Sequence, residues 1–231
     1  MVQEDFKDIL GTSASVCQII QFFSGILVCR KFMKKGSSDD VSGIPFICGF
    51  LSCGLWSGYA KLLGDLILIY INVLGSFLMF SYVCVFYVFS SKRSKLIKQI
   101  LIIIAFLVII QTHIKSLEEF ESKRKHLGIV CSVVTISFFA SPLTDLARVI
   151  RVKSAESLPF PLILMSTIVS FQWTLYGYVI KDGFVMYLNL AGFCLSFFQL
   201  LLFCLYPARW MVNNSNNITV VIPEHRIKIT S

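Results

Sequence analysis

The stretch WSGYAKLLGDLILIYINVLGSFLMFSYVCVF, residues 56–86, decides the fold, because a second version of it occupies residues 173–203. The two versions lie 117 positions apart. Matched residues include Trp56 and Trp173, Tyr59 and Tyr176, Asp65 and Asp182, Tyr70 and Tyr187, Asn72 and Asn189, Gly75 and Gly192, Phe80 and Phe197, and Phe86 and Phe203. Tryptophan, aspartate and asparagine are not the usual residues of a lipid-facing helix, so the matches indicate a duplication rather than chance.

The composition is that of a membrane protein. Hydrophobic residues make up 56% of the 231 positions, and charged residues only 15%. A soluble domain cannot bury that much apolar side chain, so the solvent must be lipid. Acidic residues (Glu4, Asp5, Asp8) precede the first apolar run in place of the basic region of a cleaved signal peptide. We therefore expect the first apolar segment to be retained.

Seven apolar segments are each close to the ~20 residues that a helix needs to cross a bilayer. They occupy residues 9–29, 43–63, 66–89, 97–113, 127–147, 158–180 and 184–206. The runs are continuous rather than alternating, which favours helices over barrel strands. The predicted fold class is an all-α membrane protein with seven transmembrane helices.

The duplication predicts a three-plus-one-plus-three organisation. Residues 1–90 would form one three-helix repeat and residues 127–207 the other. A linker helix at about 97–113, with its loops in residues 91–126, would join them, and residues 208–231 would form a disordered cytosolic tail. A three-helix unit ends on the side of the membrane opposite to its start. The single helix in between therefore makes the two bundles parallel.

The formal net charge of +8 is distributed in short basic clusters between the apolar runs. This pattern reports membrane orientation and does not indicate nucleic-acid binding. With the N-terminus outside, the inner side holds twice as many of the 21 lysines and arginines as the outer side. The sequence thus predicts an external N-terminus and a cytosolic C-terminus.

The eight cysteines all fall within apolar stretches, without a Cys-x-x-Cys pair. They predict neither a disulfide framework nor a metal site. The segment map also brings no nucleophile, base and orienting group together, so we expect neither an enzyme nor a cofactor.

Several motifs resemble those of the SWEET (MtN3/saliva) sugar transporters, in the form of an animal-type member. They are VSGIPF at 41–46, SPL at 141–143, KSAESLPF at 153–160 and WTLYG at 173–177, together with the repeat-matched residues above. The resemblance covers roughly residues 10–207. It implies parallel repeats about an axis along the membrane normal. It also implies sugar transport by alternating access.

Asn72 and Asn189 are the first candidates for substrate binding. An amide in the middle of an apolar helix costs free energy unless it is hydrogen-bonded, so it either ties helices together or binds a ligand. Amides both donate and accept hydrogen bonds, as sugar hydroxyls do. The resemblance implies that these two asparagines face each other at the bilayer midplane and contact the sugar.

Trp56 and Trp173 are the second pair of candidates. A lone tryptophan is often an interface anchor, but a flat indole can also stack on the C–H face of a sugar ring. The resemblance implies the second role. Ser52 lies one helical turn before Trp56 and should face the same cavity. Its repeat counterpart is Val169, which predicts an asymmetric cavity.

Two gates are implied by the resemblance. Pro45, Pro142 and Pro159 would provide the bends of an inner gate, although Pro45 and Pro159 would also suit simple helix starts. The family carries a fourth proline in the first helix, and none occurs near Gly25.

Tyr59, Tyr176 and Asp182 would form the outer gate, with interface anchoring as the alternative role of the tyrosines.

Ionisable groups are nearly absent from the apolar segments. Asp145 is the only carboxylate clearly inside one, with Arg148 three residues later. This favours downhill, ion-independent transport of a neutral solute. Together with the resemblance, it leads us to expect facilitative, bidirectional, ion-independent transport of a mono- or disaccharide. A carrier of another neutral polar solute, a seven-helix receptor and a non-transporting scaffold are the alternatives. A receptor would leave the duplication unexplained.

The expected partners are a small sugar and the lipid bilayer, and the resemblance is also compatible with a homo-oligomer. The plasma membrane is the expected location, with the Golgi or another internal membrane as the alternative.

Overall fold

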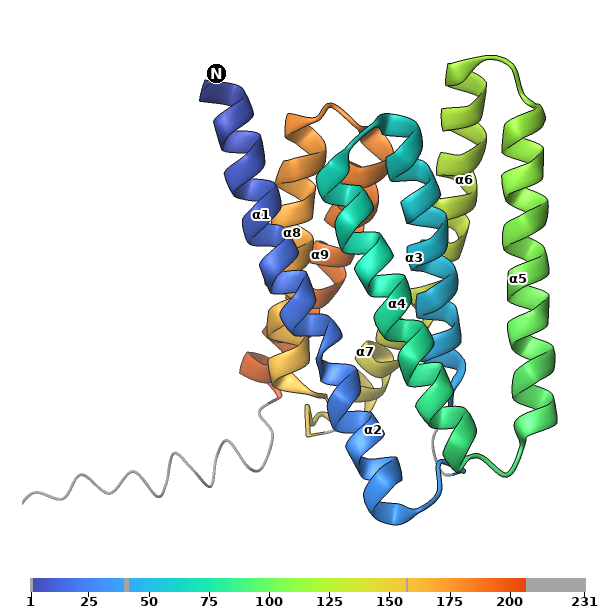
Figure 1. Cartoon of the computed structure of the whole chain (residues 1–231). Coiled ribbons are helices and arrows are strands. Elements are labelled where there is room, and N and C mark those ends of the chain that lie inside the picture. The colour runs from blue at the N-terminus through green and yellow to red at the C-terminus, as the bar shows by residue number, and fades with distance from the viewer. Residues whose placement is uncertain (1, 40–41, 157, 207–231) are drawn as a thin grey trace, which may run out of the picture.

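The computed structural model describes residues 2–39, 42–156 and 158–206, and the tail predicted for 208–231 lies outside them. Helices and short connections make up this described part (Figure 1). The helices are α1 (Val2–Phe22), α2 (Ser24–Lys35), α3 (Ile44–Leu63), α4 (Leu66–Phe89), α5 (Arg93–Ser116), α6 (Phe120–Phe138), α7 (Ala140–Val152), α8 (Phe160–Val179) and α9 (Gly183–Leu205). They provide seven stretches long and apolar enough to span a membrane. The predicted all-α class with seven spans is confirmed.

Three of the seven spans are longer than the sequence predicted. The first runs over Glu4–Lys35, the fourth over Arg93–Ser116 and the fifth over Phe120–Val152. The hydropathy signal ends where charged residues begin, but the helices continue. Lysine and arginine can lie along a helix end while their charged groups reach water. Hydropathy therefore places the apolar core of each span better than its ends.

The first and fifth spans are each interrupted once. A turn at Phe23 separates α1 from α2, and Phe139 separates α6 from α7. The sequence predicted a bend near Pro142, which lies in the first turn of α7. The first span is broken although it contains no proline, so another interaction must hold that break open.

The turns show that the two copies share a backbone. Gly36 and Lys153 both have positive φ (71° and 55°), and so do Gly64 and Lys181 (70° and 55°). Within each pair the residues are 117 positions apart. Positive φ is uncommon for residues other than glycine. The second copy thus keeps the left-handed turns of the first even where lysine has replaced glycine.

The helices pack in a repeat-related pattern. α3 packs along α4, and α8 packs along α9. Between the copies, α1 packs against α8, and α6 packs against α3. These two contacts are equivalent, because each joins the first span of one copy to the second span of the other. The helix without a counterpart, α5, packs on α3 and α6.

The buried apolar side chains form three clusters. One lies at the end of the bundle that carries the N-terminus and draws on both copies, with Leu55 and Tyr59 packed in the same cluster as Trp173 and Tyr176. The other two lie at the opposite end and each belong to one copy. They contain Phe32, Phe46 and Phe86 in the first copy, and Val149, Ile163 and Phe203 in the second.

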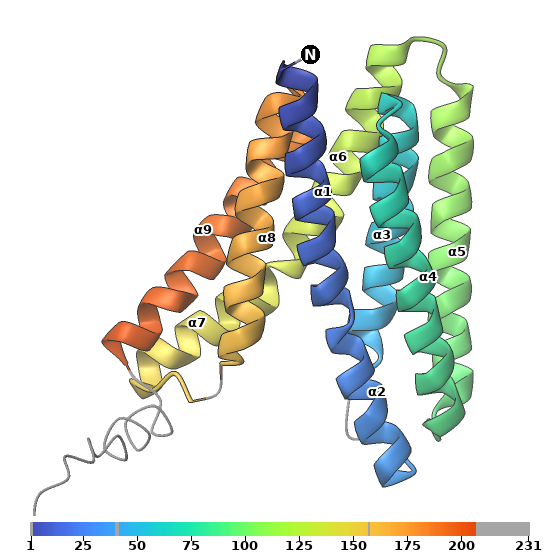
Figure 2. The same ribbon diagram turned by 60° about the vertical axis from the view of Figure 1, so that its left-hand side comes forward.

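The distribution of these clusters matches the shape of the bundle. Helices of the two copies converge at the N-terminal end, whereas α7 and the end of α9 lean away from α2 at the opposite end (Figure 2). The copies are thus packed together at the N-terminal end.

Gly177 allows α8 and α9 to approach closely at the N-terminal end. A Cβ atom there would lie 2.5 Å from the backbone nitrogen of Met186 and 2.7 Å from its Cα. We expect Gly177→Ala to destabilise the protein by about 1–3 kcal/mol, because backbone cannot move aside as a side chain can. The melting temperature in detergent measures this.

Gly54→Ala is the matched control for this prediction. The nearest atom to a Cβ at Gly54 is a methyl carbon of Leu107, at 3.3 Å. Since that methyl group can shift and alanine suits a helix interior, the change should leave stability unchanged or raise it by up to about 1 kcal/mol. Equal melting temperatures for the two variants would contradict the close approach at Gly177.

Candidate functional site

A cavity of about 210 Å³ lies where the two copies meet, and helices from both contribute to its wall. All five residues predicted to bind substrate line it. The full lining consists of Gln18, Phe22, Ser52, Cys53, Trp56, Leu68, Ile71, Asn72, Trp173, Val185 and Asn189. The structure thus brings together the side chains that the repeat pattern selected, although they come from four helices.

The two asparagines have the same local geometry. Asn72 Nδ2 donates to the carbonyl of Leu68 at 2.8 Å, and Asn189 Nδ2 donates to the carbonyl of Val185 at 2.8 Å. One N–H thereby fixes each amide on its own helix. Within the described part of the chain, neither amide oxygen accepts a hydrogen bond. Each amide retains an acceptor and a second N–H for a ligand.

The amides lie closer to the N-terminal end of the bundle than expected. Each is six residues beyond the first residue of its helix, α4 or α9, which corresponds to about 9 Å along the axis. The sequence had suggested the middle of the apolar segments. The two amides instead lie within two turns of the aspartates that begin these helices.

The two indoles are oriented by neighbouring tyrosines. Trp56 meets the ring of Tyr59 edge-on, with the centroids 5.5 Å apart, and Trp173 meets Tyr176 in the same way at 5.3 Å. Trp56 also donates its Nε1–H to Thr135 Oγ1 at 3.2 Å. Such edge-to-face contacts hold flat rings in a defined orientation.

The cavity is asymmetric, as the sequence predicted. Ser52 lines it, whereas the equivalent Val169 is buried and lies outside the lining. Gln18 of the first copy lines the cavity. Its equivalent in the second copy, 117 positions later, is Thr135, which accepts the hydrogen bond from the Trp56 indole. The sequence analysis missed Gln18 and Thr135, because residues of different type give only a weak repeat signal.

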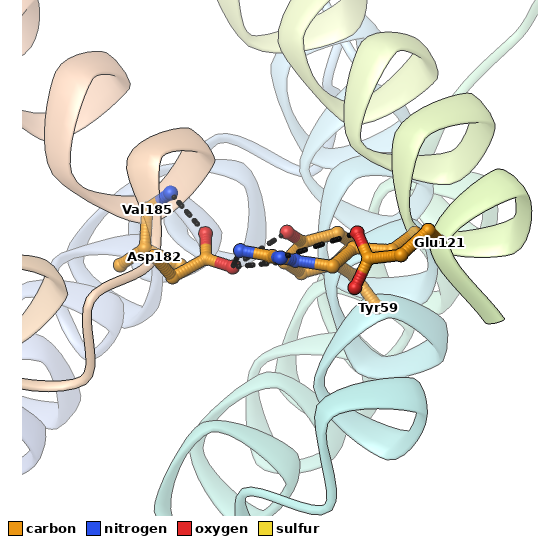
Figure 3. Close-up of polar contacts among 5 residues, drawn as sticks. Tyr59, Glu121, Asp182 and Val185 are labelled. Carbon is orange, nitrogen blue, oxygen red and sulfur yellow. Dashed lines mark hydrogen bonds and ion pairs between the residues drawn. The ribbon is translucent and has the colours of Figure 1, made fainter.

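At the N-terminal end, each of the two tyrosines predicted for the outer gate binds an aspartate of the other copy. The Tyr59 hydroxyl donates to Asp182 Oδ2 at 2.8 Å (Figure 3). The Tyr176 hydroxyl lies 2.9 and 2.8 Å from the two carboxylate oxygens of Asp65. Both tyrosines are fully buried. The sequence paired Asp65 with Asp182 in the repeat but assigned only Asp182 to a gate.

The helix starts position these carboxylates. Asp65 is the N-cap of α4 and accepts from the backbone N–H of Leu68 at 3.1 Å. Asp182 is the N-cap of α9 and accepts from Val185 N–H at 2.9 Å, as Figure 3 shows. Aspartate is a preferred N-cap, and the positive end of the helix dipole favours its charge. Each aspartate therefore has a local structural role as well as its bond to a tyrosine.

A cation accompanies each buried aspartate. Lys7 Nζ lies 3.2 Å from Asp65 Oδ2, and Arg124 Nη2 lies 3.0 Å from Asp182 Oδ2. Arg124 also contacts the exposed Glu121 at 3.5 Å, which Figure 3 includes. A buried carboxylate needs such compensation. We call Lys7, Asp65, Tyr176, Arg124, Asp182 and Tyr59 the twofold polar cluster.

The two cations were missed by the sequence analysis, which counted them only toward membrane orientation. Lys7 and Arg124 are also 117 positions apart. Extending the repeat comparison upstream of Trp56 would have found them as a matched pair of bases.

The twofold polar cluster separates the cavity from a second hollow of about 410 Å³. Lys7, Asp65, Arg124 and Asp182 line this outer hollow, while Leu68 and Val185, one turn into α4 and α9, line the central cavity. The cavity is therefore closed toward the N-terminal end of the bundle.

Two of the three prolines lie at the opposite end, and Pro142 lies within the fifth span. Pro45 is in the first turn of α3, Pro159 is the N-cap of α8, and Pro142 follows the break before α7. None of them lines the central cavity. Pro45 and Pro159 thus occupy helix starts, one of the two roles that the sequence allowed, and only Pro142 adjoins an interruption within a span.

Comparisons with known proteins agree with this architecture. A family model described as sugar efflux transporter for intercellular exchange matches residues 8–94 and 125–210, on either side of α5. The chain is 40% identical over 205 residues to sugar transporter SWEET1 of Drosophila pseudoobscura pseudoobscura, covering 87% of this chain and 90% of that protein. It is 32% identical to human sugar transporter SWEET1, covering 87% and 92%.

A solved structure has the same fold. The 3.7 Å structure of a eukaryotic SWEET transporter superposes with a TM-score of 0.84, at 24% sequence identity, over 89% of this chain and 99% of that one.

Proposed function

This chain belongs to the SWEET (MtN3/saliva) family of sugar transporters, and we propose that it carries neutral sugars down their gradient in either direction. The observation that supports the proposal most is the central cavity, in which two indoles and two partly free amides meet. Indoles can stack on the C–H face of a sugar ring while the amides bind its hydroxyl groups. We assign sugar binding to Asn72, Asn189, Trp56 and Trp173, with Ser52 as an additional contact.

The size of the cavity favours a monosaccharide over a disaccharide. The cavity has a volume of about 210 Å³. It is below the ~300 Å³ at which cavities begin to enclose drug-sized ligands. A single hexose ring with its hydroxyl groups is on this scale.

Transport would proceed by alternating access. We propose that the two three-helix units, residues 1–90 and 127–207, rock about the central cavity. Tyr59, Tyr176 and Asp182 act as the outer gate, now together with Asp65, Lys7 and Arg124. The hydrogen bonds of Tyr59 and Tyr176 join the units at the N-terminal end, and the opposite ends of the units diverge (Figure 2), which supports this proposal. Pro142 supplies one hinge, and Pro45 and Pro159 begin the helices that border the inner opening.

The orientation we propose has the N-terminus outside and the C-terminus in the cytosol. It rests on the basic residues around α2, the α4–α5 turn and α7, which occupy the end opposite to the N-terminus. In this orientation the structure is inward-facing. We further propose that the protein lies in the plasma membrane. We also propose that it can form homo-oligomers, which measurements of particle size in detergent would test.

The lining of the cavity supports transport without ion coupling. It contains amide, hydroxyl, thiol, indole and hydrocarbon groups, and no aspartate, glutamate, lysine, arginine or histidine. The buried carboxylates Asp65 and Asp182 lie in the outer gate and are each paired with a base. A coupled carrier is expected to place ionisable groups beside the bound substrate, and the lining of this cavity has none among the described residues.

Reconstitution tests the proposed function. Purified protein in liposomes loaded with unlabelled glucose should accumulate radiolabelled glucose by counterflow. The initial rate of accumulation should saturate as the glucose concentration rises. The accumulation should persist in the presence of a protonophore. Protein-free liposomes and an Asn72→Ala/Asn189→Ala double variant serve as controls. Collapse by the protonophore would refute ion independence, and counterflow of a neutral amino acid instead of glucose would favour the rival carrier.

A further inference from the structure

The interruption of the first span exposes a backbone carbonyl. The N–H of Ile26 bonds to the carbonyl of Phe23 at 3.0 Å, instead of the carbonyl four residues back, which is that of Phe22. The Phe22 carbonyl accepts from the Tyr82 hydroxyl at 3.2 Å. Tyr82 comes from α4 and is buried, with 5% of its surface exposed. A side chain 60 residues away in sequence therefore satisfies the carbonyl at the break.

The fifth span has a matching contact. Gln199 of α9 donates its Nε2–H to the carbonyl of Pro142 at 3.2 Å, just after the break at Phe139. Gln199 is buried, with 6% of its surface exposed. Tyr82 and Gln199 are 117 positions apart, so they occupy the same place in the two copies. In each copy the third span therefore donates a hydrogen bond to the first span near its interruption. The acceptors differ, because Phe22 lies at the first break and Pro142 lies three residues beyond the second.

Gly25 explains how the first break exists without proline. Gly25 and Pro142 are also equivalent positions, 117 residues apart. A Cβ atom at Gly25 would lie 2.3 Å from Cε2 of Tyr82. Any larger residue, proline included, would displace the tyrosine ring. In the first copy, Gly25 leaves room for the ring of Tyr82. In the second copy, the equivalent residues are Pro142 and Gln199.

We propose that Tyr82 and Gln199 are positioning residues for transport, which hold the bends that let α2 and α7 move apart at the inner end. The proposal rests on the proposed function. α2 packs on α4, and α7 packs on α9. Each donor therefore lies where the inner segment of the first span packs against the third span of the same copy. Both hydrogen bonds are partly buried. A carbonyl that is withdrawn from water at a bend is stabilised by such a donor. Opening the inner end requires the bend, so loss of the donor slows that step.

Tyr82→Phe removes only the hydroxyl group. In equilibrium exchange of glucose across proteoliposomes, it should lower the maximal rate per transporter about 2- to 10-fold, the factor expected for one hydrogen bond. KM should stay within twofold, because Tyr82 does not line the cavity. Gln199→Leu should behave in the same way and tests the second copy independently. Tyr70→Phe, on the same helix but 70% exposed, should match the wild type.

Hydrogen exchange of the wild type and Tyr82→Phe tests the bend without reference to transport. The amides around Phe23 should exchange faster in the variant, and those around Phe139 should not. An unchanged exchange pattern with unchanged maximal rates would overturn the proposal, as would a rise in KM that matches the fall in rate. If the wild type itself transports no sugar, the proposed function fails, while the exchange result still decides whether Tyr82 holds the bend.

Discussion

Replacing Asn189 with alanine should lower the glucose transport efficiency (maximal rate divided by KM) about 10- to 100-fold, with the protein folded and at the surface. Truncation removes the free N–H and the amide oxygen that face the cavity, so sugar hydroxyl groups would lose their partners in a largely apolar site. A buried unsatisfied polar group costs about 1–3 kcal/mol, which gives this range of rates. Asn72→Ala should lose a similar amount, because its local geometry is the same.

The control for this prediction comes from the same helix. Tyr187 lies two residues before Asn189 in α9 and is 65% exposed, so its side chain faces away from the cavity. Tyr187→Ala removes a larger side chain and should leave transport within about twofold of wild type. Uptake of labelled glucose into cells that lack their own hexose carriers, normalised to surface protein, measures all three variants. Near-normal uptake by both asparagine variants would move the sugar site elsewhere.

Asp182→Asn should have the largest effect on stability, about 3 kcal/mol of destabilisation. Asparagine is as good an N-cap as aspartate and can still accept from Tyr59, so the change isolates the charge. Arg124, 27% exposed, then loses the partner that lies 3.0 Å away. Arg124 would keep only the exposed Glu121, at 3.5 Å. The cost of this poorly compensated base near the core, rather than a lost bond, is the reason for the expected fall in melting temperature.

Asp145→Asn is the matched control for the charge. Asp145 pairs with Arg148 at 3.7 Å on an exposed face, with 37% and 58% of the two side chains accessible. Such pairs contribute at most about 1 kcal/mol. In addition, Arg124→Gln combined with Asp182→Asn should recover part of the lost stability. Equal melting temperatures for Asp182→Asn and Asp145→Asn would show that the twofold polar cluster does not stabilise the closed end.

The central site could be predicted from the sequence because duplication marks it twice. Asn72, Asn189, Trp56 and Trp173 are of types that rarely occur by default in apolar segments, and their constant spacing identified them before any geometry was known. Gln18 could not be found in this way. Its counterpart Thr135 differs in type and role, so only the fold shows that it reaches the cavity.

Two other features depend on packing between distant residues. The bases of the twofold polar cluster look like surface charges in the sequence, because Lys7 and Arg124 lie at the edges of apolar runs. Their position follows from how α1 and α6 pack against the other helices. The break at Phe23 depends on Tyr82, and hydropathy or proline content cannot report a hydrogen bond between helices.

The most direct test of the central claim is an experimentally determined structure with glucose bound. We expect the sugar ring in the central cavity, between the indoles of Trp56 and Trp173 and within hydrogen-bond distance of both Asn72 and Asn189. Sugar found only in the outer hollow beyond the twofold polar cluster, or in the cavity without contact to either amide, would contradict it.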